Sequence, residues 1–331
     1  MLSSKERVLM AMNHEDTDRV PMDYWAWQVV NENMLKRLSL KDYDELLGSL
    51  GVDLRTVRAP YVGSSDCWAG LQNARTIEDL EKCELPSADM FDYSNIEKLC
   101  DKYSYYAVMG GAWSPIFCTA SGLIGMETLM VKMYDDPGFV HLFLKRINDL
   151  FYEQSARTFE AANGKMDIFF MGDDYGTQRG LIMSAEMWDE FYALHLARLF
   201  SLAKDFGLKV MLHSCGSVIR LIPRLIELGM DALDPVQVRA ADMAPEILKA
   251  QFGDSITFHG GVDTQRLLPF GTVEEVRAET KRLIEIFGCG GGYILAPSQE
   301  FLPDIPLENI IAMYEVGRNT PAPTRATGSL S

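Results

Sequence analysis

Eight short apolar runs, each followed by a helical segment, are the feature that most limits the folds open to this chain. The runs are rich in β-branched, aromatic and other apolar residues and cover residues 19–27, 51–58, 105–113, 167–174, 209–216, 232–237, 256–263 and 293–299. Strands that alternate with helices predict parallel β-α units. Eight such units in one α/β chain predict a single (β/α)8 barrel, the TIM-barrel architecture. An open doubly wound sheet is the alternative, but the sequence has no G-x-G-x-x-G turn to support it.

The helical segments carry recognisable end signals. Ser184 precedes a long periodic run that stops at Gly207, as expected for an N-cap and a C-terminal glycine. Thr272 and Glu275 fit a capping box at the start of another helix. These signals support helices between the predicted strands.

The chain is expected to form one domain with three irregular parts. The barrel should occupy residues 1–318, with a helical extension at its N-terminus. An insertion between the second and third strands, residues 59–103, is interpreted as a lid or partner-binding surface, and a structural extension is the alternative. Residues 319–331 are rich in Pro, Thr, Ser and Gly and are predicted to be disordered.

The net charge and the cysteine pattern limit the kinds of binding partner and the cellular compartment that we expect. With 47 acidic and 31 basic residues, the formal net charge is −16, which argues against nucleic acid and anionic membranes as partners. The six cysteines form no C-x-x-C pair, and no apolar run is long enough to span a bilayer. We therefore expect a cytoplasmic protein in a reduced setting, either a monomer or a homodimer.

Polar side chains gather at the carboxyl ends of the predicted strands, where barrel enzymes build their sites. His213 and Cys215 end the fifth run and lie two residues apart, so they share one face of a strand. An imidazole beside a thiol suits zinc, whereas the alternative is a buried cysteine next to a hydrogen-bonded histidine. The strand-end residues are Asp53, Asp173, Asp174, Tyr175, Gln178, His213, Cys215, Gln237, His259, Asp263, Gln299 and Glu300.

The acids of this set are the catalytic candidates. Asp53 lies on an apolar strand, where a buried carboxylate needs a partner; it either pairs with Arg55 or orients a substrate and handles a proton. Asp173 and Asp174 are adjacent, so one is expected to face the barrel mouth while the other caps a loop or pairs with Arg179. Two neighbouring acids can raise each other's pKa, which would make one of them a usable general acid.

Other residues of the set are candidates for proton delivery or for binding a substrate. Tyr175 is an alternative proton donor and, with the tryptophans, can form an apolar wall for a methyl-bearing or aromatic substrate; core packing explains the tryptophans almost as well. The candidate substrate-binding residues are Trp25, Gln178, Gln237, His259, Asp263 and Gln299.

Six segments, which together span almost the whole chain, resemble the uroporphyrinogen decarboxylase superfamily. They read KERVLMAMNHEDTDRVPMDYWAW, GVDLRTVR, MGDDYGTQRGLIMSAEMW, HSCGSV, FHGGVDTQRLLPFGTVEEV and GGGYILAPSQEFLPDIPLENI. The resemblance implies a (β/α)8 barrel, and its HSCG and eighth-strand segments are most similar to the cobalamin-linked methyltransferase branch. Decarboxylases of the superfamily carry an arginine-rich motif after the first strand, whereas residues 23–33 of this chain contain no arginine. Asp53 aligns with the acid that the decarboxylases use at the pyrroles.

The methyltransferase branch implies a zinc ion held by a His-x-Cys pair and a further ligand after strand eight. His213 and Cys215 match the pair, but LAPSQE stands where that branch resembles LAPGCG. Glu300 is therefore the expected third ligand, with Gln299 and Cys289 as alternatives. A His–Cys–oxygen set would make zinc a stronger Lewis acid than a thiolate-rich set, which favours activation of an ether oxygen or amine nitrogen.

The sequence and the resemblance together predict a zinc-dependent methyltransferase. It would demethylate a small methylated compound, such as a methoxylated aromatic (O-demethylation), and pass the methyl group to a corrinoid protein that supplies the cobalamin. The alternatives are a metal-free decarboxylase of a smaller carboxylated substrate and a non-catalytic protein that binds a corrinoid or substrate.

Overall fold

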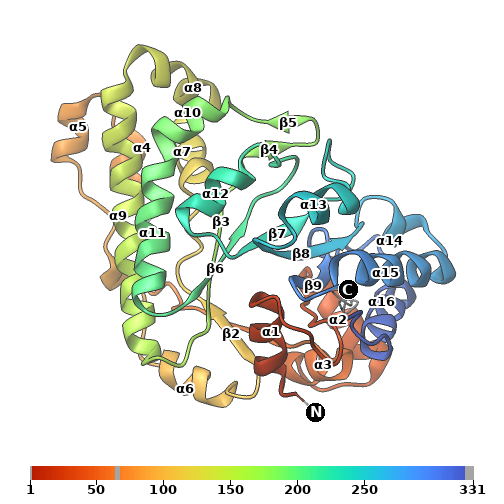
Figure 1. The fold of residues 1–331 in the computed structure, drawn as a ribbon. Coiled ribbons are helices and arrows are strands. Elements are labelled where there is room, and N and C mark those ends of the chain that lie inside the picture. The colour runs from red at the N-terminus through yellow and green to blue at the C-terminus, as the bar shows by residue number, and fades with distance from the viewer. Residues whose placement is uncertain (1, 64–67, 325–331) are drawn as a thin grey trace, which may run out of the picture.

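The fold, taken from a computed structural model, is described for residues 2–63 and 68–324. Within these residues, seven parallel strands form one curled sheet and follow each other in chain order (Figure 1). The strands are β1 (Leu54–Val57), β2 (Ala107–Gly110), β3 (Ile168–Gly172), β6 (Lys209–His213), β7 (Ala232–Val236), β8 (Thr257–Val262) and β9 (Tyr293–Pro297). The hairpin of β4 (Gly176–Thr177) and β5 (Gly180–Leu181) follows β3. The fold is therefore the predicted α/β barrel type.

Residues 19–27, the first predicted strand, cross the gap between β9 and β1 without forming a regular strand. The amide of Leu295 in β9 donates to the Pro21 carbonyl, and the amide of Asp53 donates to the Met22 carbonyl. The prediction of a regular strand over residues 19–27 is wrong because neither Pro21 nor Met22 offers its amide to a ladder. The amide of Met22 donates to a carboxylate oxygen of Asp53, and Pro21 has no amide hydrogen.

Helices surround the sheet, and α9 and α11 run side by side along one wall while α15 and α16 pack together on another (Figure 1). The N-terminal third contains α1 (Ser4–Met12), α2 (Gln28–Leu38), α3 (Tyr43–Leu50), α4 (Ala69–Asn73), α5 (Ile77–Lys82), the 3-10 turn η1 (Ala88–Met90) and α6 (Ile96–Lys102). The middle contains α7 (Ile116–Ile124), α8 (Met126–Asp135), α9 (Pro137–Ala162), α10 (Ala185–Trp188), the π-helical turn η2 (Asp189–Ala193) and α11 (Leu194–Asp205). The remainder contains α12 (Ile222–Leu228), α13 (Pro245–Phe252), α14 (Leu267–Phe270), α15 (Val273–Phe287) and α16 (Leu307–Asn319).

The expected helix signals act as caps. The Ser184 hydroxyl accepts a hydrogen bond from the Met187 amide, and α10, η2 and α11 then run without a break to Asp205. Thr272 and Glu275 form the predicted capping box at the start of α15. Gly207, two residues beyond the end of α11, has a φ of 75°, a left-handed conformation that glycine adopts without strain.

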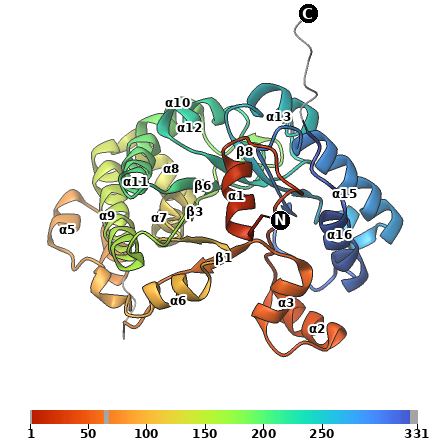
Figure 2. The ribbon, with the colours of Figure 1, turned by 60° about the horizontal axis from the view of Figure 1, so that its bottom comes forward.

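The helix α1 closes the amino-terminal end of the barrel (Figure 2). Val8 and Met12 on its inner face pack with strand residues that include Leu54, Met211 and Ile294, and all five side chains are buried. Removal of this apolar surface from water is the main force that fixes the helix there. The opposite end, where the strands have their carboxyl termini, is left for a site.

The insertion between β1 and β2 packs along the barrel wall. Its elements α5, η1 and α6 contact α9, and the Trp68 ring meets the Phe151 ring of α9 edge-on. These contacts hold the insertion against α9, and residues 64–67 lie outside the described part. Near the C-terminus, Pro321 forms an isolated antiparallel β-bridge with Arg19. Residues 325–331, which are part of the segment predicted to be disordered, lie outside the described residues.

No single helix of the described chain is long and apolar enough to cross a membrane. The bent pair α7 and α8, whose axes meet at 100°, passes this test as a pair, by length and composition alone.

Candidate functional site

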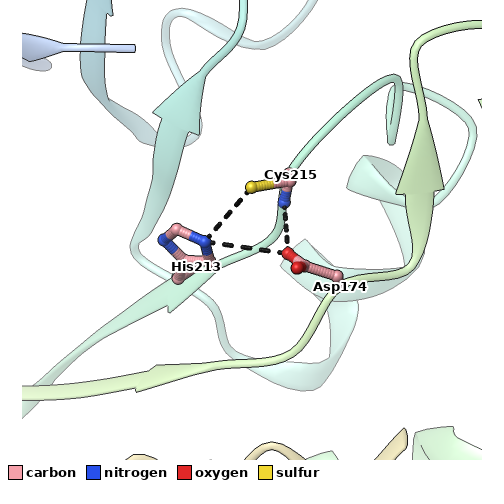
Figure 3. A group of neighbouring side chains, drawn as sticks. All are labelled: Asp174, His213 and Cys215. Atoms are coloured by element: carbon pink, nitrogen blue, oxygen red, sulfur yellow. Dashed lines mark hydrogen bonds and ion pairs between the residues drawn. The ribbon is translucent and has the colours of Figure 1, made fainter. Parts of the chain in front are cut away.

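Asp174, His213 and Cys215 form a compact group at the carboxyl ends of β3 and β6 (Figure 3). One potential ligand atom of each residue lies within 4.8 Å of the others. The His213 Nε2 atom is 3.4 Å from the Cys215 sulfur and 3.7 Å from a carboxylate oxygen of Asp174. Imidazole, thiolate and carboxylate are three of the usual protein ligands of zinc. The group can therefore hold a metal ion.

Backbone structure fixes this geometry. The amide of Cys215 donates to a carboxylate oxygen of Asp174 at 2.9 Å, which ties the loop after β6 to the loop after β3. Gly216 follows with a φ of 81°, and a Cβ atom there would lie 2.6 Å from the carbonyl oxygen of Thr177. Only glycine fits this turn without a clash. The turn brings the Cys215 thiol back over the end of β6.

A row of acids and imidazoles, joined by hydrogen bonds and an ion pair, leads from this group into the barrel. The register of β6 and β7 puts His213 beside Asp234, and His213 Nδ1 lies 2.6 Å from the Asp234 carboxylate. The other oxygen of Asp234 lies 2.5 Å from Nδ1 of His259, whose Nε2 is 3.0 Å from Asp23. A His213 Nδ1–H that donates to Asp234 leaves the Nε2 lone pair free for a metal ion.

The charges along this row of side chains shift the pKa values of His259 and Asp234 in opposite directions. Burial alone would lower the pKa of His259, but the carboxylates of Asp234 and Asp23 raise it to about 10. Burial alone would raise the pKa of Asp234, yet the two imidazoles hold it below its usual range. The Cys215 thiol differs, because burial and then the nearby Asp174 raise its pKa well above the ordinary value. A thiolate there needs a cation beside it.

A cavity of about 400 Å³ adjoins the group. Trp25 and Trp113 line it, and their rings lie 5.5 and 5.3 Å from the His213 ring. Its size is in the range of small-molecule sites, which are mostly apolar with a few polar groups. The lining residues are Asp23, Tyr24, Trp25, Tyr43, Thr56, Arg58, Met109, Trp113, Phe170, Asp234 and His259.

Asp53, a predicted catalytic residue, lies at the opposite end of the barrel. It precedes β1, is fully buried, and pairs with Arg7 at 2.8 Å and Arg19 at 2.7 Å. Arg55, its expected partner, instead donates to backbone carbonyls and stacks over Tyr106. The placement of Asp53 at the barrel mouth is wrong because the residue comes before the strand and not at its carboxyl end. Its contacts are those of a structural ion pair.

The adjacent acids after β3 divide as one of the expected alternatives describes. Asp174 is half-exposed and faces the metal group, whereas Asp173 is buried and accepts hydrogen bonds from the amides of Phe117 and Cys118 at the start of α7. Burial raises the pKa of Asp173 to about 6, although these amides oppose the shift. Tyr175 is also buried, and its ring packs on Trp188 and Tyr192. Neither Asp173 nor Tyr175 can reach a substrate in the cavity.

The predicted polar substrate-binding residues have mixed placements. Gln178 donates to the side-chain oxygen of Gln237, which also accepts the Gly216 amide, so this pair supports the turn after Cys215. Asp263 accepts the amides of Gln265 and Leu267 and thus shapes the loop after β8. His259, in contrast, lines the cavity, as Trp25 does.

The residues after β9 lie next to the metal group but do not complete it. The Gln299 amide donates to the Cys215 sulfur at 3.0 Å. Glu300, the expected third ligand, accepts a hydrogen bond from the Trp27 indole, and Asp174 takes its place in the group. Cys289 precedes β9, and its thiol donates to the Thr324 carbonyl away from the mouth. The third member of the group thus comes from the loop after β3, and not from the loop after β9 that the resemblance indicates.

Asp234, Asp23 and Arg58 are site residues that the sequence analysis missed. Asp234 lies inside an apolar run, which is the same signal that singled out Asp53. Asp23 and Arg58 also stand in predicted strand runs, where a buried charge needs a reason. The sequence therefore contains a signal for the acids inside the apolar runs, but it does not indicate which residues they pair with.

Comparisons with known proteins agree with the fold. Residues 50–320 match the family model described as uroporphyrinogen decarboxylase (URO-D). The chain is 27% identical over 220 residues to methylated-thiol–coenzyme M methyltransferase of Methanosarcina mazei; the match covers 62% of this chain and 52%, about half, of that relative. It is 23% identical over 347 residues to methylcobamide:CoM methyltransferase MtaA of Methanosarcina barkeri, with 93% and 96% covered. A solved methyltransferase from Methanosarcina mazei has a TM-score of 0.68 at 19% identity and covers 96% of this chain and 99% of its own. This structural likeness shows a shared fold.

Proposed function

Because the chain belongs to the uroporphyrinogen decarboxylase (URO-D) family, we propose that it is the zinc-dependent methyltransferase that its site chemistry favours. It would move a methyl group between a small methylated substrate and a corrinoid protein. The observation that carries the proposal is the Asp174, His213 and Cys215 group beside an aromatic cavity. Two relatives that carry methyltransferase names support it.

The donor set fits zinc on the chemistry of its own contacts. His213 Nε2 is oriented by the bond from Nδ1 to Asp234, which is the usual second contact of a metal-binding histidine. The raised pKa of the Cys215 thiol means that a nearby cation would be needed to hold it as thiolate. Asp174 supplies an oxygen ligand from a half-exposed side. Zinc prefers such nitrogen, sulfur and oxygen donors.

Bound zinc would supply Lewis-acid polarisation of the oxygen or nitrogen that leaves the methyl group. The protein residues contribute position and exclusion of water. Trp25 and Trp113 pack on the imidazole of His213, and the aromatic side chains of the cavity offer flat walls to a ring. We therefore propose a methoxylated aromatic as substrate and O-demethylation as the reaction, with cobalamin supplied by the partner protein.

The test combines metal content with methyl transfer. Purified protein should contain zinc by elemental analysis and should transfer methyl groups from a panel of methoxy compounds to cob(I)alamin. His213→Ala and Cys215→Ala should lose both properties, while Cys289→Ala, at the other end of the barrel, should keep them. The proposal fails if metal-free protein stays inactive after zinc is added, or if Cys215→Ala transfers methyl groups as well as Cys289→Ala.

The family match also favours a second candidate, metal-free decarboxylation of a small carboxylated substrate. Release of carbon dioxide by zinc-free protein would support it. Tight ligand binding without turnover, unchanged in Cys215→Ser, would instead indicate a non-catalytic binding protein.

A further inference from the structure

Arg58 borders the cavity without an acidic partner in the described part of the chain. It follows β1, and its guanidinium donates to the carbonyl oxygens of Gly111 at 2.7 Å and Phe170 at 2.9 Å. Two of its five N–H donors are thus used, and neither bond neutralises the charge. The two carboxylates of the cavity wall do not pair with it, because those of Asp23 and Asp234 face His259.

This cation is held in low-polarity surroundings. Burial lowers its pKa to about 10, so the guanidinium still carries its charge at neutral pH. Its central carbon lies 5.4 Å from the Trp113 ring centre and 5.7 Å from that of Phe170. Aromatic faces stabilise a cation weakly, by about 0.5–2 kcal/mol, and do not replace an anion. A charged group in such a position is usually paired.

The contrast is with two buried arginines, Arg7 and Arg55, and with the partly buried Arg19. Arg7 and Arg19 share the carboxylate of Asp53 at the closed end of the barrel. Arg55 has two carbonyl contacts like Arg58, but it stacks at 3.7 Å on Tyr106 and lines no part of the cavity. Arg58 thus combines a partly buried charge that no acid neutralises, unused donors and an adjoining space.

We infer that the methylated substrate carries a carboxylate and that Arg58 binds it inside the cavity. This inference rests on the proposed function and specifies its substrate class as a methoxylated aromatic acid. Trp113 contacts both the Arg58 guanidinium and the His213 ring, so a planar ring beside it would reach from one to the other. The carboxylate would then lie at Arg58 and the methoxy group toward Asp174, His213 and Cys215. Arginine is suited to carboxylates because its planar fork matches their two oxygens.

Binding measured without turnover tests the inference on the whole protein. The ortho, meta and para isomers of methoxybenzoate are compared with the matching methoxybenzamides, which keep the shape and lose the charge. Affinity is followed by tryptophan fluorescence, since Trp25 and Trp113 line the cavity, and by calorimetry. We expect at least one acid to bind about tenfold or more tightly than its amide, because a charged hydrogen bond is worth more than a neutral one.

Two variants locate the effect. Arg58→Met should weaken the acid about tenfold or more and leave the amide unchanged, whereas Arg55→Met, which also removes a buried guanidinium, should keep the preference for the acid. Equal affinities of acids and amides for the wild type would overturn the inference even if Arg58→Met fails to fold. Lack of binding by any compound, or a preference retained in Arg58→Met, would overturn it as well.

The outcome is separable from the proposed function. Methyl transfer from the amides as fast as from the acids would remove the carboxylate requirement while the methyltransferase assignment stands. Selective binding of acids through Arg58, without methyl transfer to cob(I)alamin, would refute the methyltransferase assignment, whereas the carboxylate-binding site at Arg58 would stand.

Discussion

Two buried aspartates at opposite ends of the barrel have different kinds of partner. Asp53, near the closed amino-terminal end, pairs with Arg7 and Arg19, whose charges are permanent. Asp234, toward the open end, lies between the imidazoles of His213 and His259, which can titrate and can bind metal ions. Both acids sit in or next to apolar strands. The chemistry of the partners, and the end of the barrel, separate a structural ion pair from a site.

The first prediction breaks the structural pair. Asp53→Ala should lower the free energy of unfolding by about 3–5 kcal/mol, because it takes the buried anion from both arginines and leaves Arg7 with Asp18 alone. Urea unfolding measures the change. Asp18→Ala is the control, since Asp18 pairs with Arg7 from a side chain that is 38% exposed, and it should lose about 1 kcal/mol or less. Equal losses in the two variants would refute the contrast.

The second prediction concerns zinc binding at the open end of the barrel. Asp234→Asn should reduce zinc affinity about 10- to 100-fold, because His213 loses the acceptor that orients its ring. Competition with a chelator measures the affinity. Asp23→Asn, which alters the contact to His259 and makes no contact with His213, should change it far less. If both substitutions weaken zinc binding to the same extent, Asp234 does not act through His213.

The third prediction uses pH. His259 has a folded pKa raised from 6.5 to about 10, so its protonated form stabilises the fold. That contribution is complete below pH 6.5 and disappears as the pH rises toward 10. The stability advantage of wild type over His259→Gln should therefore shrink between these values, as followed by unfolding at several pH values. A constant advantage would mean that His259 is neutral when folded.

The fourth prediction concerns the smallest effect. Glu300→Ala should leave zinc affinity within about twofold, as expected for a surface substitution that touches no ligand. Asp174→Ala is the matched comparison and should weaken zinc binding strongly. The reverse result would restore Glu300 as the third ligand and remove Asp174 from the group.

The apolar runs and the helix caps predict the fold because they depend on local properties of the chain. The apolar residues of β6 mark a buried strand, and the cap of Ser184 acts on an amide only three residues away. The first run fails as a regular strand because Asp53, distant in sequence, takes the Met22 amide. Such side-chain competition depends on the assembled barrel, and a local pattern does not contain it.

The candidate site is predictable only in part. His213 ends β6 and Cys215 lies in the turn that follows it, so a short stretch of chain brings the two side chains together. The choice between Asp174 and Glu300 depends on how two loops turn, and the Trp27 indole draws Glu300 away. Asp234 was visible as an acid in an apolar run, but its two imidazole partners follow from the registers and packing of β6, β7 and β8.

Zinc-edge X-ray absorption tests the central claim that Asp174, His213 and Cys215 hold the metal. The account predicts one sulfur at about 2.3 Å together with nitrogen and oxygen ligands near 2.0–2.2 Å. The sulfur should disappear in Cys215→Ser and persist in Cys289→Ala. A zinc spectrum without a sulfur ligand, or one unchanged in Cys215→Ser, would contradict the account.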